Sequence, residues 1–169
     1  INSLVLVEPN LAVERRADGS LRVSGLETGA VPAAGDTDFL KLLLAQNEVV
    51  IEGGELLWMD RRAGAQDERL SVKGVALRLR NNGDRHRLDF RADFPQDLCA
   101  ECRLRADLRG DPEKASSWRG EIGVTARALS LGGLPRVLRE RLPTGLDGRF
   151  DLKLESRWRN AHPEKIEGR

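Results

Sequence analysis

The stretch Leu98–Leu108, LCAECRLRADL, alternates strictly: every even-numbered residue is small or apolar, and most odd-numbered residues are charged. The same two-residue period runs through Arg87–Phe94 (RLDFRADF) and Leu146–Glu155 (LDGRFDLKLE). Because successive side chains of a β-strand point to opposite faces, each stretch predicts a strand with one apolar and one charged face. Several such strands side by side predict a sheet with a continuous apolar surface.

Glycines and polar turns divide the other strand-like segments. Val49–Ile51 and Leu56–Met59 flank Gly53-Gly54, a pattern that predicts a β-hairpin. Within Arg69–Arg80 the apolar residues change from even to odd positions, which predicts a β-bulge near Lys73-Gly74. The remaining predicted strands are Ser3–Val7, Leu11–Arg15, Leu21–Val23, Leu88–Phe94, Leu98–Leu108, Trp118–Ala126 and Leu146–Trp158.

Two short helices are predicted among the strands. Phe39–Gln46 follows capping residues at Asp36–Asp38, and its nearly uniform apolar character suggests that it packs on the apolar face, plugging or capping one end. A buried strand is the alternative for this segment. Leu134–Leu142 has apolar residues at helical spacing, with Pro135 in the first turn.

The element order predicts a mainly β fold with minor α content. Because short turns join most of the strands, we expect a long curved antiparallel sheet. Long twisted strands curl, so this sheet should form a trough or a partly open barrel, with one or two short helices packed on its apolar face.

Composition limits the class of protein. The chain has 169 residues, 40% hydrophobic and 33% charged, which suits one folded domain. With 28 basic and 27 acidic residues the net charge is +1, which argues against a nucleic-acid partner. Arginines and carboxylates interleave on the charged strand positions, a pattern that predicts solubilising cross-strand pairs.

The two ends of the sequence suggest that it is part of a longer chain. No segment approaches the roughly 20 apolar residues of a membrane span, and no basic-then-apolar signal segment is present. The chain opens at Ile1 directly into a strand pattern and ends at Arg169 in mid-pattern. We therefore expect residues 1–169 to be a single β-rich module, a fragment of a larger protein.

No arrangement of titratable residues indicates catalysis. His86 lies among charged residues beside a predicted turn and is expected to be a solvated surface residue, whereas His162 falls in a polar tail. The carboxylates alternate with arginines on strand faces, which favours surface ion pairs over an acid/base dyad. We therefore predict that the chain is not an enzyme and has no cofactor.

The cysteines form a single C-x-x-C motif, Cys99 to Cys102. A zinc site would need two more ligands, and the redox version of this motif normally opens a helix. Three-residue spacing within a strand would place the two sulfurs on opposite faces. We therefore predict a structural role for the pair and no metal site.

The order of several motifs resembles a known family. The segments that carry the resemblance are ADGSLRVSGL (17–26), FLKLLLAQ (39–46), VVIEGGELLWMD (49–60), LSVKGVALRL (70–79), Asn82-Gly83, HRLDF (86–90), WRGE (118–121) and LKLESRW (152–158). In this order they resemble the periplasmic region of the AsmA-like proteins of Gram-negative bacteria, in particular of the very long YhdP-type members.

The resemblance implies a function as well as a fold. Such proteins are anchored in the inner membrane by an N-terminal helix and extend a long curved β-sheet with a hydrophobic groove into the periplasm. The family is associated with moving phospholipid between the inner and outer membranes and with outer-membrane integrity. For this chain, the resemblance implies phospholipid acyl chains and neighbouring segments of the same polypeptide as partners. Membrane contact would come only through the anchor, which this sequence lacks.

The apolar strand positions are the candidate site. An acyl chain needs a trough that excludes water, and each buried CH₂ contributes about 0.8 kcal/mol. Each candidate has the alternative of an ordinary core position, in a structural or scaffolding module whose closed core supports protein–protein contacts. The candidate groove residues are Leu77, Leu79, Leu88, Phe90, Phe94, Leu104, Leu108, Ile122, Val124, Phe150, Leu152 and Leu154.

Overall fold

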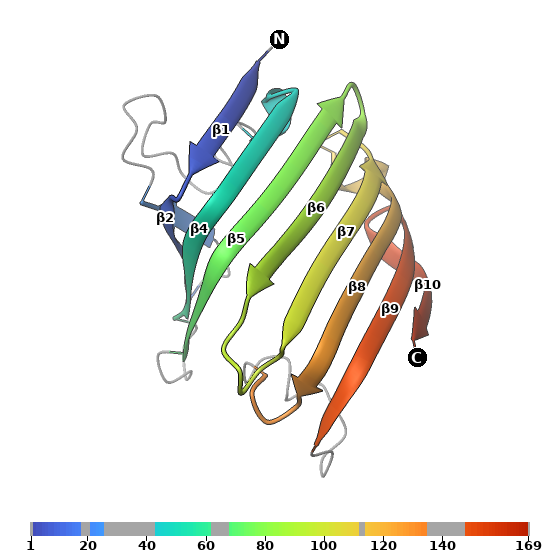
Figure 1. Cartoon of the computed structure of the whole chain (residues 1–169). Helices are drawn as coiled ribbons and strands as arrows, with labels where there is room; N and C mark the ends of the chain where they lie inside the picture. Colours follow the sequence, from blue (N-terminus) through green and yellow to red (C-terminus); the bar gives the residue numbers. More distant parts are fainter. Residues whose placement is uncertain are drawn as a thin grey trace.

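The computed structural model shows one open, strongly twisted sheet of ten strands (Figure 1). The strand order is β10-β9-β8-β7-β6-β5-β4-β2-β3, with β1 also paired to β4, and the sheet is not closed into a barrel. The structure describes residues 2–17, 21–25, 43–61, 68–111, 114–134 and 148–168. The strands are β1 (Ser3–Val7), β2 (Asn10–Arg15), β3 (Leu21–Ser24), β4 (Glu48–Asp60), β5 (Glu68–Asn82), β6 (Arg85–Asp93), β7 (Glu101–Arg109), β8 (Arg119–Ser130), β9 (Arg149–Arg159) and β10 (His162–Gly168).

The predicted mainly β fold is confirmed, and β4 to β10 form an antiparallel meander. The sheet is mixed, however, because β1 and β2 both run parallel to β4. β1 pairs with residues 48–52 of β4, and β2 follows it along the same edge, opposite residues 55–60. The chain keeps its direction between the two strands, so they lie end to end.

The predicted hairpin at Gly53-Gly54 is wrong. β4 runs without interruption for 13 residues, from Glu48 to Asp60. Its register with β5 shifts on both sides of Gly54, and Gly53 has a φ of 71°. A glycine pair suits a bulge as well as a turn, and here it makes a bulge. Pro9, between β1 and β2, packs against Gly54 at 3.1 Å from the position a Cβ would occupy.

The predicted bulge at Lys73-Gly74 is confirmed. The register between β5 and β6 shifts between Lys73 and Ala76, and Gly74 has a φ of 55°. Gly54 pairs with Val75, so the bulges of β4 and β5 lie side by side. Bulges bend strands and increase their twist, which curves the sheet along this line.

Only part of the predicted helical content falls on described residues. Residues 43–45 are helical, and Ala115–Ser117 form a short 3₁₀ helix. The Asn81 side-chain Nδ2 donates to the carbonyls of Leu43 at 3.0 Å and Gln46 at 2.6 Å, which holds the end of the first helix beside the end of β5. Residues 39–42 of Phe39–Gln46, and the predicted helix beyond Leu134, lie outside the described residues.

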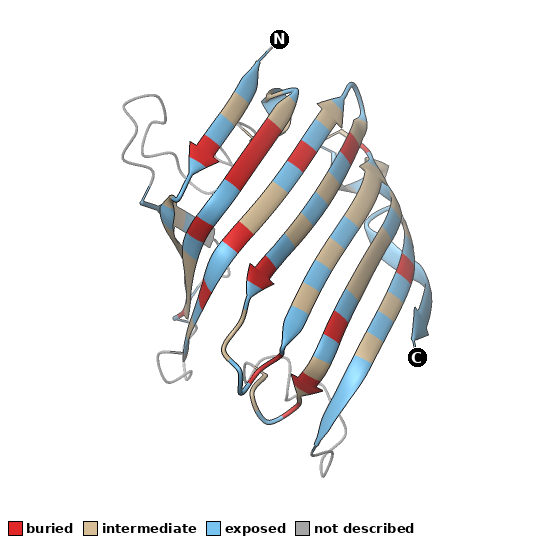
Figure 2. Ribbon diagram, in the orientation of Figure 1, coloured by how far each residue is buried: buried red, intermediate tan, exposed pale blue. Residues whose placement is uncertain are grey.

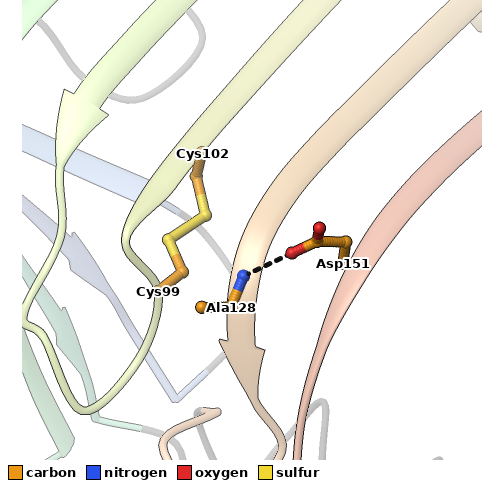
Figure 3. Close-up of a disulfide and its surroundings, with 4 residues drawn as sticks. All are labelled: Cys99, Cys102, Ala128 and Asp151. Carbon is orange, nitrogen blue, oxygen red and sulfur yellow. Dashed lines mark hydrogen bonds between the residues drawn. A yellow bond between two sulfur atoms is a disulfide. The ribbon is translucent and has the colours of Figure 1, made fainter.

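Cys99 and Cys102 form a disulfide (Figure 3). The expectation that their sulfurs lie on opposite faces is wrong because β7 begins at Glu101, and Cys99 precedes it. Cys99 lies in a turn, where its N–H and that of Leu98 donate to the carbonyl of Pro95. Cys99 is 1% exposed, so the disulfide fastens this turn to the core.

Two clusters of buried residues form the core. Leu70 and Phe94 pack against both clusters, so the apolar interior is continuous between them. Elsewhere the sheet alternates between half-buried and exposed residues, seen in Figure 2 as tan and pale blue along β7. The clusters consist of Leu6, Ile51, Val72, Val75 and Ala92, and of Leu98, Cys99, Ala126 and Leu129.

Candidate functional site: the apolar face of the sheet

The apolar residues of neighbouring strands lie directly opposite one another. Since residues two apart on a strand share a face, two successive cross-strand rows form one apolar surface. The first row is Leu4, Val49, Leu79, Leu88, Ala106, Ile122, Ser156 and Ile166. The second row is Leu6, Ile51, Leu77, Phe90, Leu104, Val124, Leu154 and Gly168.

Several predicted groove residues belong to the core. Leu77 and Phe90 pack against the first buried cluster, Leu152 packs against the second, and Phe94, just after β6, packs against both. Leu79 is itself only 8% exposed. Of these five, only Leu79 is fully buried, and the other four are half-buried but pack against a buried cluster.

The other predicted residues do not pack against either buried cluster. Phe150 is 38% exposed near the start of β9, opposite Leu129. The rest are half-buried, belong to neither cluster and lie on the same face of four neighbouring strands, β6 to β9. We call them the apolar strip: Leu88, Leu104, Leu108, Ile122, Val124 and Leu154.

The apolar strip offers a ligand almost no directional bonds. Ser156, the polar residue opposite Ile122, is already satisfied. Its Oγ donates to the Ile122 carbonyl at 3.1 Å and accepts the Trp158 indole N–H at 2.9 Å. A surface of this kind binds hydrocarbon through the hydrophobic effect, which is non-directional. It can hold a chain without fixing its position.

The opposite face of the same strands is charged. Its predicted cross-strand ion pairs are confirmed, for example Arg105 with Asp89 and Arg157 with Glu121, each at 3.1 Å. These side chains are mostly exposed, so each pair adds no more than about 1 kcal/mol. Hollows on this face lie between successive rows of charged side chains, and one of them is lined by Arg87, Asp89, Arg105 and Asp107 among others.

Asp107, on the charged face, is held by two arginines. Arg85 donates to both of its oxygens, at 2.8 and 2.6 Å, and Arg87 adds a contact at 3.2 Å. The hydrogen bonds from Arg85 lower the pKa of Asp107 below its ordinary value, despite some opposing desolvation, and the pairing raises the pKa of Arg85. Asp107 is therefore ionised at neutral pH.

His86 is buried, and its expected solvated position is wrong. It is 5% exposed, and its ring lies 5.1 Å from that of Trp118. Its Nδ1 is 2.7 Å from the Asn81 Oδ1, and its Nε2 is 3.3 Å from the Gly110 carbonyl. The Asn81 amide donates its Nδ2 to two carbonyls, so its Oδ1 accepts from the His86 Nδ1–H. The alternating pattern could have predicted this burial, because His86 is two residues before Leu88 on the same strand and its side chain therefore lies on the apolar face.

Neither a membrane-crossing helix nor a cluster of at least three His, Cys, Asp or Glu residues suited to a metal ion occurs in the described ranges. Comparison with known proteins finds no matching family model, no matching curated protein and no matching solved structure. A functional assignment therefore depends on the geometry of the sheet.

Proposed function

We propose that this chain is a non-catalytic module that holds phospholipid acyl chains against the apolar strip. It would do so as part of an inner-membrane-anchored, AsmA-like periplasmic protein involved in phospholipid transport to the outer membrane and in envelope integrity. The observation that carries the proposal is the half-burial of aligned aliphatic side chains from β6 to β9, on one face of an open sheet.

The dimensions and energetics of the apolar strip suit hydrocarbon. Neighbouring strands lie about 4.8 Å apart, so the four strands span about 14 Å. A chain segment of about five methylenes pressed against the apolar strip would gain about 4 kcal/mol. That gain is large enough to retain an acyl chain and small enough to let it leave.

The disulfide supports a periplasmic location. Structural disulfides persist in oxidising compartments, including the bacterial periplasm, and are rare in the cytosol. The bond between Cys99 and Cys102 fastens the turn before β7, so the native fold would depend on an oxidising compartment such as the periplasm.

The direct test is the content of the purified protein. Native mass spectrometry of the chain, expressed with its disulfide formed, is expected to show bound phospholipid or detergent. A fluorescent fatty acid should then bind saturably, with a dissociation constant between about 1 µM and 1 mM. Absence of any bound amphiphile, together with no uptake of the fatty acid, would contradict the proposal.

A scaffolding role is the second candidate, and the β1 edge favours it. The segment SLVLV has no charged residue, pairs on one side with β4, and exposes Val5 by 54% and Val7 by 68%. An uncharged apolar edge of this kind is a template for pairing with another strand. Neighbouring segments of the same polypeptide are the proposed partners. Chemical crosslinking in the parent protein would identify them.

A further inference from the structure

A row of arginines crosses the charged face at the end of the sheet where β6 and β8 begin. The register places Arg85 opposite Arg109, Arg109 opposite Arg119, and Arg119 opposite Arg159. Like charges directly opposite one another destabilise a sheet. This arginine row (Arg85, Arg109, Arg119 and Arg159) therefore places like charges opposite one another across four neighbouring strands.

Three carboxylates near the arginine row already have arginine partners. Asp107 accepts from Arg85 and Arg87, and Glu121 accepts from Arg157 at 3.1 Å. Glu164 forms an ion pair with Arg159 at 3.0 Å.

The centre of the row lacks such compensation. Arg109 and Arg119 are both exposed and form no ion pair with another residue of the described part of the chain. Their Cα atoms face each other across β7 and β8 at about 5 Å. Two arginine side chains thus start from directly opposite positions, without a counterion from the described chain.

These arginines surround a hollow of about 400 Å³. All members of the arginine row line it, together with Arg157 and the three ion-paired carboxylates Asp107, Glu121 and Glu164, so arginines outnumber carboxylates around it. Its floor includes Gly120, where the φ is 144° and a side chain would strike the Asp107 carbonyl.

We propose that the arginine row binds a phosphate group, with Arg109 and Arg119 as the central pair. A guanidinium presents parallel N–H donors that match two oxygens of a phosphate, and an anion between two such groups removes their repulsion. The phosphate can belong to a lipid headgroup or to a soluble phosphate. The site is on the opposite face of the sheet from the apolar strip, so it does not depend on acyl-chain binding.

The test compares two double variants that remove the same charge from the same two strands. Arg109→Gln with Arg119→Gln removes the central pair. The control, Arg103→Gln with Arg127→Gln, removes arginines of β7 and β8 that both contact Glu101, at 3.3 and 3.6 Å. Circular dichroism verifies the fold of each. Binding is measured at low ionic strength, where exposed charges act most strongly.

Two probes distinguish the sources of phosphate. One is inorganic phosphate, followed by calorimetry, and the other is flotation with phosphatidylcholine vesicles containing phosphatidylglycerol. We expect saturable binding of at least one probe, weakened about tenfold or more by the central double variant and less than about twofold by the control. Arg109→Lys with Arg119→Lys should give an intermediate loss, because lysine keeps the charge without the paired donors.

The outcomes separate cleanly. Binding of inorganic phosphate assigns a soluble-phosphate site, whereas binding of vesicles alone assigns a headgroup site. Equal losses in the two glutamine variants would show general charge attraction, and binding of neither probe would show no site; either result overturns the proposal. Because the apolar strip is on the other face of the sheet, failure here leaves the acyl-chain result unaffected.

Discussion

Replacing Val124 with glutamine should weaken acyl-chain binding by about tenfold to a hundredfold. Val124 lies at the centre of the apolar strip, with Leu104 and Leu154 directly opposite it on β7 and β9. A glutamine there removes part of the apolar contact with the acyl chain, and each methylene that loses this contact costs about 0.8 kcal/mol of binding free energy. In addition, the glutamine amide loses its hydrogen bonds to water when an acyl chain covers it. Fluorescent fatty-acid titration measures the effect.

Thr125→Gln is the matched control for this variant. Thr125 is the next residue on β8, but it is exposed on the charged face, opposite Arg103 and Lys153. Its replacement should change binding by less than about twofold, since surface substitutions of this kind are nearly neutral. Equal binding by the two glutamine variants would place the acyl chain somewhere other than the apolar strip.

Gly120→Ala should cost about 3 kcal/mol or more of the free energy of unfolding. Gly120 has a φ of 144°, and a Cβ there would collide with the Asp107 carbonyl and lie 2.9 Å from the Leu108 Cα. Both neighbours belong to the backbone of β7, which cannot move aside without opening the sheet. Urea denaturation measures the loss.

Gly148→Ala is the control that separates the cost of the backbone conformation from the cost of the steric collision. Gly148 also has a positive φ, 126°, but a Cβ there would meet nothing within 4 Å. Its replacement should cost only about 1 kcal/mol, which is the strain of the backbone conformation alone. Similar losses for the two alanine variants would mean that β7 and β8 do not approach as closely at Gly120 as the structure shows.

Alternation predicted the central strands because it depends only on the pleat. It identified the apolar face and, through the change of phase at Lys73-Gly74, the bulge of β5. It could not place β1 and β2, because parallel pairing beside β4 depends on contacts between distant segments. The wrong hairpin prediction at Gly53-Gly54 has the same cause. The local residues suit either a turn or a bulge, and pairing with the neighbouring strands makes it a bulge.

The candidate site was predicted in part. The alternating pattern placed its side chains on one face, but which of them pack against the buried clusters depends on the curvature of the sheet. Leu77 and Val124 look alike in the sequence, yet Leu77 packs against a buried cluster, whereas Val124 lies in the open strip. The arginine row was invisible for a related reason: Arg85 and Arg159 are far apart in sequence, and only the register aligns them.

The most direct test of acyl-chain binding is photocrosslinking from adjacent residues of one strand. Benzoylphenylalanine is placed at Val124 or at Thr125, and the protein is illuminated with bound phospholipid before mass spectrometry. We predict adducts on the acyl chain from position 124 and few from position 125, because the two side chains lie on opposite faces of β8. Equal labelling from both positions, or labelling from position 125 alone, would contradict acyl-chain binding on the apolar strip.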